Sequence, residues 1–268
     1  MNGTPGRIDP RVRVVSLAGS NTEIVCALGC EALLVGADDH SDFPAEVVGP
    51  LPRVGPDLEV DVGAVMELEP DLVLASLTVP GHERVVEGLE GAGLEFLALE
   101  PVSLGDVYAN IREVAHALGV PGRGERLIAE MRAELVDRGV PTTRPRIVVQ
   151  WWPRPTVAPG ALSWTTDLLG LVGAANPLGH EPVKSRPVSG DELARLDPDA
   201  LVLSWCGVPP DKVRPEAVLN SPALQSVKAV RNGHVFCVPE AYLGRPGPRL
   251  VEGYRALLSV TEAVRGGR

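Results

Sequence analysis

The side chains best suited to chemistry lie in one short acidic segment, Asp38-Asp-His40-Ser-Asp42. Carboxylates beside an imidazole are common ligands of divalent cations, and a neutral histidine also binds a metal that another molecule carries. The segment therefore suggests either a divalent-metal site made by Asp38, Asp39, His40 and Asp42, or a single metal-binding imidazole, His40. The competing interpretation is a solvated acidic turn that binds nothing.

A second group consists of aromatic residues at or just beyond the ends of expected strands in the C-terminal half. The chain has only four tryptophans, three tyrosines and three phenylalanines, yet Trp151, Trp152, Trp205 and Tyr242 all fall at such positions. Ligands of parallel α/β domains bind at the carboxyl ends of the strands. Indole and phenol faces there would suit a broad, flat and partly apolar ligand. The alternative is that these rings pack the edge of the core.

The elements that must position these residues are apolar strands alternating with short helices. We expect strands over residues 12–17, 33–37, 71–75, 94–99, 146–151, 197–204 and 235–238, with helices over 62–68 and 83–91. Ser20-Asn-Thr-Glu23 and Ser189-Gly-Asp-Glu192 have the spacing of capping boxes, which open helices. Continuous apolar strands are typical of a parallel sheet covered by helices on both faces.

The order of elements repeats in the second half of the chain. The segment from Arg146 to Trp151 is similar to the one that begins at Arg13, and a Pro-Asp pair precedes an apolar strand at both Asp71 and Asp199. The two pairs of segments are separated by similar intervals, which favours duplication of one α/β lobe. The alternative is that Pro-Asp before a strand is simply a common turn.

Between the two copies, the spacing predicts a long helix over Pro121–Arg138. Leu127, Ile128, Met131 and Leu135 recur on one helical face, and Gly139 suits a C-terminal cap. Such a helix would span about 27 Å. We therefore expect two Rossmann-like parallel-sheet lobes, an N-terminal one over residues 1–120 and a C-terminal one over 140–268, bridged by a helix over 121–139.

Composition and missing motifs exclude several classes of protein. A net charge of -10 disfavours nucleic acid as a partner, and no apolar run approaches the roughly 18–20 residues that a membrane helix needs. Met1–Pro10 lacks the apolar core of a secretion signal, so the sequence as written predicts a cytoplasmic location. No phosphate-binding, dinucleotide-binding, zinc-protease or serine-hydrolase motif is present. We expect a monomer that is not an enzyme and has no intrinsic cofactor.

Several motifs resemble one family, the helical-backbone (class III) substrate-binding proteins of ABC importers, which bind cobalamin or iron complexes. The segment from Arg13 to Val25, followed by Ala27-Leu-Gly29, is similar to the family's opening motif, with Gly19 in place of its usual proline. His40-Ser-Asp-Phe-Pro44 resembles the "H-x-D-Y-P" segment of the cobalamin-binding branch. Matches also occur at 51–55, 69–74 and 245–251, and the resemblance covers about residues 12–260.

The resemblance implies two α/β lobes joined by a long helix, with non-covalent capture of a corrinoid, haem or ferric siderophore between them. The branch favours cobalamin as the ligand, with His40 reaching its cobalt as an axial ligand. The implied ligand-binding residues are Ser20, His40, Arg53, Trp151, Trp152, Trp164, Trp205, Tyr242 and Arg245. An anionic siderophore would need converging arginines, for which Arg53, Arg154 and Arg245 are candidates. Val157 and Ser185 stand where a cobalamin binder has aromatic residues, so the tryptophans would have to compensate.

The resemblance also implies an ABC permease as partner. Members of the family usually present one glutamate on each lobe to the permease, whereas Gly63 and Asp191 stand at these positions here. Asp61 and Asp191 are the candidate docking residues, with Glu59 and Glu192 nearby.

Family members are usually periplasmic or attached to the cell surface, which conflicts with the cytoplasmic location predicted from the N-terminus. Two roles therefore stay open: a component of an ABC-type uptake system, or an intracellular corrinoid binder. The alternatives are a ferric-siderophore or haem binder, the divalent-metal binder described above, and an enzyme of the corrinoid pathway.

Overall fold

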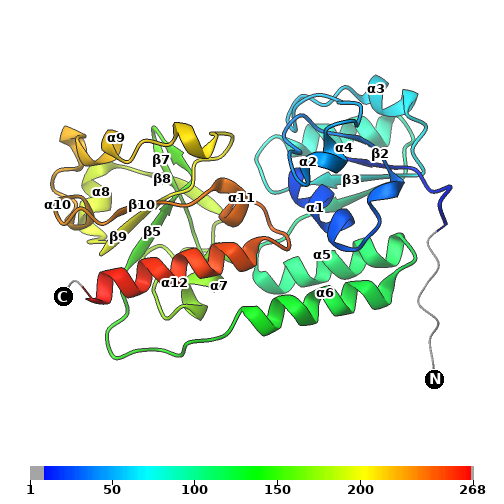
Figure 1. The fold of residues 1–268 in the computed structure, drawn as a ribbon. Coiled ribbons are helices and arrows are strands. Elements are labelled where there is room, and N and C mark those ends of the chain that lie inside the picture. The colour runs from blue at the N-terminus through cyan, green and yellow to red at the C-terminus, as the bar shows by residue number, and fades with distance from the viewer. Residues whose placement is uncertain (1–8, 267–268) are drawn as a thin grey trace. The chain divides into compact units, whose positions relative to one another are not determined.

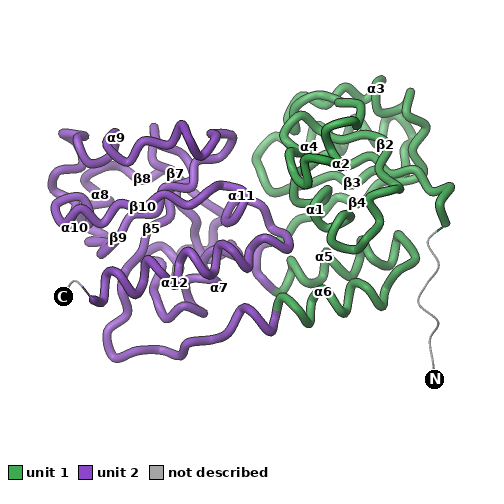
Figure 2. The backbone as a smooth tube through the Cα atoms, in the orientation of Figure 1, with its two compact units in different colours: residues 1–101, 105–131 green, residues 102–104, 132–268 purple. Residues whose placement is uncertain are grey.

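The computed structural model describes residues 9–266, and the chain divides into two compact units (Figure 2). The first unit comprises the residues up to Pro101 together with Gly105–Met131. The second comprises Val102–Leu104 and the chain from Arg132 onward. Met1–Pro10, on which the signal-peptide prediction rests, falls largely outside the described residues.

The first unit is built on a four-stranded parallel sheet in the order β2-β1-β3-β4. Its elements (Figure 1) are β1 (Val14–Ser16), α1 (Gly19–Ala27), a one-turn 3₁₀ helix η1 (Glu31–Leu33), β2 (Leu34–Ala37), α2 (Ala45–Val48), α3 (Val62–Glu67), β3 (Leu72–Ser76), α4 (His82–Gly91), β4 (Phe96–Leu99), α5 (Leu104–Ala117) and α6 (Pro121–Glu134). The central strands β1 and β3 are almost fully buried, as continuous apolar strands require. The predicted α/β class is confirmed.

The second unit repeats three parallel strands in the order β10-β9-β5 and adds an antiparallel sheet, β6-β7-β8. Its elements are β5 (Ile147–Gln150), β6 (Trp152–Pro153), β7 (Thr156–Pro159), α7 (Trp164–Leu171), β8 (Ser185–Val188), α8 (Gly190–Arg195), β9 (Ala200–Leu203), η2 (Pro210–Lys212), α9 (Glu216–Leu219), η3 (Pro222–Leu224), α10 (Lys228–Arg231), β10 (Val235–Cys237), α11 (Glu240–Leu243) and α12 (Leu250–Gly266). The sequence does not predict the antiparallel sheet, because its strands are short and contain proline, so no apolar run marks them.

The predicted duplication is confirmed by identical hydrogen bonds in the two units. The backbone N–H of Arg13 donates to the Asp71 carboxylate (2.8 Å), and the Arg13 guanidinium donates to the Leu68 carbonyl. In the second unit, the Arg146 N–H donates to Asp199 (2.9 Å) and its guanidinium donates to the carbonyl of Leu196. We call this pair of contacts, from one arginine to an aspartate carboxylate and to a backbone carbonyl, the clamp. It fixes the start of the paired strands β1 and β3 in the first unit, and of β5 and β9 in the second.

Helix α6 ends earlier than the sequence predicts, at Glu134 instead of Arg138, and Gly139 does not cap it. The reason is a tertiary contact with α12. The Tyr254 hydroxyl donates to the Val136 carbonyl (2.7 Å), and the Arg138 guanidinium donates to the Tyr254 hydroxyl (3.0 Å). These bonds hold the chain after Glu134 in a non-helical path.

Only one of the two predicted capping boxes acts as a cap. The Ser189 hydroxyl accepts from the Glu192 N–H (3.1 Å) and opens α8 as expected. At the other, α1 already begins at Gly19 after Ala18, so Ser20 lies inside the first helical turn and is buried. The prediction that Ser20 caps α1 is wrong, because the N-cap residue is Ala18.

Helices α5 and α6 lie side by side along one face of the first sheet (Figure 1). A Cβ atom at Gly124 would stand 2.6 Å from the Cβ of Ala115, so only glycine allows this close approach. Arg112 and Glu125 form an ion pair (2.6 Å) across the same interface.

The repeated clamp predicts unequal costs when its carboxylates are removed. Asp199 is buried and also accepts from the Lys228 ammonium (2.8 Å), whereas Asp71 is exposed. We expect Asp199→Ala to lower the free energy of unfolding by about 2–3 kcal/mol and Asp71→Ala by about 1 kcal/mol, because unpaired groups cost most where water cannot replace the partner. Urea denaturation of both variants measures this; equal losses would contradict it.

Candidate functional site

The loop after β2 carries the acidic segment and folds around a buried carboxylate. Asp38 is fully buried, and its two oxygens accept from the Ser41 hydroxyl and from the His40 backbone N–H (3.0 Å). The Thr22 hydroxyl in α1 lies 2.7 Å from that of Ser41 and extends the network. Burial raises the pKa of Asp38, while the bonds from Ser41 and His40 oppose this shift. The carboxylate thus fixes the loop that carries His40.

The Arg53 side chain stabilises the same loop through hydrogen bonds to backbone carbonyls. Its guanidinium donates to the carbonyls of Asp38 (2.6 Å), Ser41 (2.8 Å) and Val48 (3.0 Å). Three of its five N–H donors are therefore directed at the protein backbone. The prediction that Arg53 contacts ligand is not tested by these bonds, but they give the residue a structural task that the sequence does not reveal.

His40 is the exposed member of a histidine–aspartate–histidine cluster. Its imidazole is 54% exposed, and its Nε2 lies 3.6 Å from one carboxylate oxygen of Asp57. The other oxygen of Asp57 lies 3.3 Å from Nε2 of His82, which is buried at the start of α4. The Val79 N–H donates to Nδ1 of His82 (3.3 Å), so the proton of a neutral His82 ring lies on Nε2 and points at Asp57.

The cluster has a clear electrostatic consequence for Asp57. The hydrogen bond from His82 holds the pKa of Asp57 below its usual value; partial burial opposes the shift, and the nearby His40 imidazole adds to it. Asp57 is therefore ionised behind His40. A carboxylate in contact with one ring nitrogen orients an imidazole and strengthens it as a metal ligand, which is the arrangement common around metal-bound histidines.

The four-residue metal site suggested by the sequence is not formed. Asp38 faces inward and its oxygens are used by Ser41 and His40, while Asp39 and Asp42 are exposed. Within residues 9–266, no group of three or more histidine, cysteine or acidic side chains is arranged to hold a metal ion. The divalent-metal alternative, as based on these residues, is wrong because the fold uses Asp38 to build the loop.

Two of the candidate tryptophans lie in the interior of the second unit. Trp164 is 5% exposed, and its indole N–H donates to the Leu243 carbonyl (2.7 Å). Trp205 is 7% exposed, and its N–H donates to the Gln150 side chain (3.0 Å). Trp205 follows the alternative interpretation, that strand-end aromatics pack the core, and Trp164 is buried at the start of α7. Burial of these two indoles is favourable because the N–H of each one donates a hydrogen bond to an acceptor in the interior.

The other aromatic candidates are accessible to different degrees. Trp152 in β6 is 46% exposed, and Trp151 is half-buried with its ring stacked on Trp164 (6.0 Å between centroids). Tyr242 is half-buried under the guanidinium of Arg249, 5.6 Å from the ring centroid. Arg245 pairs with Glu240 (3.2 Å) in the same segment. Tyr242 and Arg245 thus belong to one polar and aromatic segment after β10.

Two buried donors lie at the carboxyl ends of adjacent strands in this unit. Gln150 of β5 pairs in register with Leu203 of β9, so the residues that follow them, Trp151 and Ser204, stand next to each other. The Trp151 indole nitrogen and the Ser204 hydroxyl oxygen are buried and make no hydrogen bond within the described part of the chain. Such groups are rare and need an acceptor from a water or a ligand.

The remaining candidates occupy distinct environments. Ser20 is buried, with its hydroxyl 3.4 Å from the Asn21 side chain. Asp61 is exposed and caps α3 by accepting from the Ala64 N–H (3.0 Å). Asp191 is exposed in the first turn of α8. Helices α3 and α8 precede equivalent strands of the two units, β3 and β9, and both docking candidates lie at the N-terminal ends of these helices, Asp61 at the N-cap and Asp191 two residues after the N-cap.

Sequence reasoning misses Asp57 and His82 in the first unit and Gln150 in the second. His82 begins α4, at the end of the loop that follows β3, so the rule that strand ends carry ligand sites could have drawn attention to it. Nothing in the sequence singles out Asp57, which lies in an irregular loop 25 residues before His82.

Comparison with known proteins places these features in a family context. The family model for periplasmic binding proteins matches residues 14–242. A Bacillus subtilis protein described as an uncharacterized ABC transporter substrate-binding lipoprotein is 28% identical over 91% of this chain and 78% of its own length. A vitamin B12-binding protein of Pectobacterium carotovorum is 26% identical over 95% and 90%.

Solved structures agree with this fold. A periplasmic heme-binding protein of Pseudomonas aeruginosa has a TM-score of 0.78 and 29% identity, with 93% of this chain and 92% of that protein covered. Among residues 9–266, no helix combines the length and apolar character needed to cross a bilayer.

The lowered pKa of Asp57 makes a prediction about acid stability. Because its folded pKa lies below the usual 3.8, the unfolded chain binds the proton first, and the stabilisation by this carboxylate is lost as pH falls below about 4. Asp57→Asn should therefore be less stable than the parent protein at about pH 6, with the difference shrinking toward about pH 3. Urea denaturation at several pH values measures it. Asp39→Asn, an exposed change near the same loop, is the control; a pH-independent difference for Asp57→Asn would contradict the assignment.

Proposed function

This chain belongs to the periplasmic binding protein family, and from that premise we propose that it is the substrate-binding component of an ABC-type uptake system and captures a corrinoid. Capture is reversible and non-covalent, without bond-making in the ligand. The observation that carries the proposal is the exposed His40 imidazole, held at the end of β2 with an ionised carboxylate behind it.

His40 offers what a metal-bearing macrocycle needs. A corrinoid carries cobalt with an exchangeable axial position, and a neutral imidazole is a suitable nitrogen ligand for it. Asp57 keeps the ring oriented, while the bonds made by Asp38 and Arg53 keep its loop fixed. Preorganisation of this kind lowers the entropy lost on binding. The similarity to a vitamin B12-binding protein supports a corrinoid as the ligand.

The second unit offers groups that suit the periphery of such a ligand. Trp152 presents an exposed indole for contact with an extended ring system. The buried donors of Trp151 and Ser204 would be satisfied by acceptors, and a corrinoid carries amide carbonyls around its ring. Tyr242 and Arg245 add a phenol and a guanidinium in the segment after β10.

Haem is the second candidate ligand. The similarity to a heme-binding protein favours it, and the same histidine could bind an iron-centred macrocycle. A titration separates the classes: purified protein is mixed with aquocobalamin, haemin or a ferric hydroxamate siderophore, and the tryptophan fluorescence and visible spectrum are recorded. Saturable quenching by the corrinoid alone is expected. A response to haemin alone would replace the corrinoid with haem, and no response to any of the three would overturn the proposal.

Axial ligation by His40 predicts a difference between two forms of one ligand. His40→Ala should weaken aquocobalamin binding by about tenfold or more, equivalent to about 1.4 kcal/mol, and change cyanocobalamin binding far less, because cyanide blocks the exchangeable position. Equilibrium titration of both ligands measures the difference. His116→Ala, an exposed change on α5, is the matched control. Equal effects of His40→Ala on both ligands would remove the ligation step while leaving capture itself intact.

We further propose that Asp61 and Asp191 dock on the permease of the uptake system. Both carboxylates are exposed and lie at the N-terminal ends of equivalent helices in the two units. In the double variant Asp61→Asn and Asp191→Asn, the asparagine keeps the capping acceptor of α3 but removes the charge. Ligand affinity should stay unchanged while transporter-dependent uptake in cells falls. Exchange of two exposed acids elsewhere, Glu67→Gln and Glu130→Gln, is the control; unchanged uptake in the Asp61 and Asp191 variant would contradict docking.

A further inference from the structure

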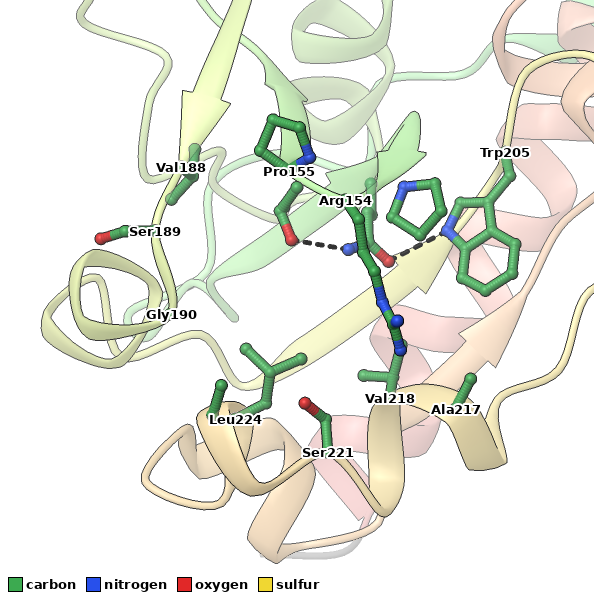
Figure 3. A pocket seen from close by; sticks show the side chains of 14 residues that line it. Arg154, Pro155, Val188, Ser189, Gly190, Trp205, Ala217, Val218, Ser221 and Leu224 are labelled. Carbon is green, nitrogen blue, oxygen red and sulfur yellow. Dashed lines mark hydrogen bonds between the residues drawn. The ribbon is translucent and has the colours of Figure 1, made fainter.

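The second unit contains a cavity of about 410 Å³ that the proposed function does not use (Figure 3). It lies between the antiparallel sheet, Trp205 (the second residue after β9), and the segment that runs from α9 to η3. The volume is within the range of roughly 300–1,000 Å³ common for small-molecule sites. Most of its wall is apolar, formed by side chains that include Val188, Val218 and Leu224.

The cavity is on the opposite face of the antiparallel sheet from the exposed Trp152. Pro153 pairs with Thr156, and Thr156 pairs with Val188; all three line the cavity. Trp152 pairs with Val157, and successive residues of a strand point to opposite faces. The exposed indole and the cavity are therefore separate surfaces of one sheet, and occupation of the cavity does not depend on the corrinoid proposal.

The floor of the cavity is a directed chain of hydrogen bonds, drawn as dashed lines in Figure 3. The Trp205 N–H donates to the Gln150 carbonyl oxygen (3.0 Å), and the Gln150 amide donates to the Thr156 hydroxyl oxygen (2.7 Å). All three residues are buried. Because the Thr156 oxygen accepts from Gln150, its own O–H is left as a donor at the end of the chain. The floor therefore favours a ligand with acceptor atoms.

Arg154 provides the cavity's one charge among the lining residues that the structure describes. It lies in the turn between β6 and β7, and Figure 3 shows its guanidinium extending across the cavity toward Val218 and Ser221. Its side chain is exposed. A guanidinium binds a carboxylate through two parallel hydrogen bonds, and this pairing is stronger beside apolar walls than in open water.

We propose that this cavity binds a small organic monocarboxylate with an apolar body. The carboxylate pairs with Arg154 and accepts from the donors of the floor, and the apolar body packs against Trp205 and the aliphatic wall. The apolar contact supplies affinity, while the single cation selects the acid over an uncharged molecule of the same shape.

Acid and alcohol pairs with matched bodies test the proposal. Calorimetric titration uses 3-methylbutanoate, octanoate and 4-phenylbutanoate, each beside the corresponding alcohol. At least one acid should bind saturably, and its alcohol should bind about tenfold more weakly. Arg154→Gln should lower the affinity for the acid to that for the alcohol and leave the alcohol unaffected. Arg195→Gln, an exposed arginine on α8 that does not line the cavity, is the matched control and should change nothing.

A second variant locates the binding. Ala217→Trp places a large ring at an exposed position on the cavity rim and should abolish binding of the acid, with the folded state verified by thermal unfolding. The proposal is overturned if none of the three acids binds, if each alcohol binds as tightly as its acid, or if Arg195→Gln and Arg154→Gln reduce affinity equally. Binding that survives Ala217→Trp in a folded variant would also overturn it, since the acid would then occupy another place.

Discussion

The repeated clamp between a strand-opening arginine and a distant aspartate is the constraint on which the other features depend. In each unit it joins the beginnings of two paired parallel strands. The backbone N–H of the arginine donates to the aspartate carboxylate, and the arginine guanidinium donates to a backbone carbonyl at the end of the helix that precedes the second strand. Once the strand starts are fixed, the strand ends fall at one edge of the sheet, because the rise per residue is the same in both strands. Trp151 and Ser204 follow β5 and β9 and occupy such ends, and Asp38 follows β2, the neighbour of β1 in the first sheet.

The two units use these strand ends in different ways. In the first, the buried Asp38 carboxylate and the Arg53 guanidinium stabilise the loop after β2. This loop presents the exposed His40 imidazole, which contacts Asp57. In the second, the indoles of Trp164 and Trp205 are buried and hydrogen-bonded, Trp152 is exposed, and the Trp151 indole nitrogen and the Ser204 hydroxyl are buried donors without a partner among the described residues. Duplication thus supplies one scaffold, and the residues at the strand ends differ between its two copies: one carries an exposed imidazole, and the other carries aromatic rings and buried hydrogen-bond donors.

The antiparallel sheet in the second unit adds a surface that the first unit lacks. Since side chains alternate along a strand, one face presents Trp152 and the other faces the cavity lined by Thr156 and Val188. The antiparallel sheet therefore has two different surfaces, one with an exposed indole and one that lines a cavity. The buried chain from Trp205 through Gln150 to Thr156 keeps the indole of Trp205 in the wall of that cavity.

The sequence by itself determined the α/β class, the two copies and most strand positions, because apolar runs and the recurrent Arg and Asp positions report local pairing needs directly. It also singled out His40, Trp152 and the two exposed aspartates, Asp61 and Asp191. Only the tertiary structure decided that Asp38 and Arg53 serve the loop, that Trp164 and Trp205 are buried, and that Asp57 and His82 stand behind His40. The tertiary structure also decided that α6 ends at Glu134, because Tyr254, far away in sequence, donates a hydrogen bond to the Val136 carbonyl. The reason is physical: strand and helix formation depend on neighbours a few residues away, whereas the partner of a charge or an indole is chosen by packing between segments that no sequence spacing encodes.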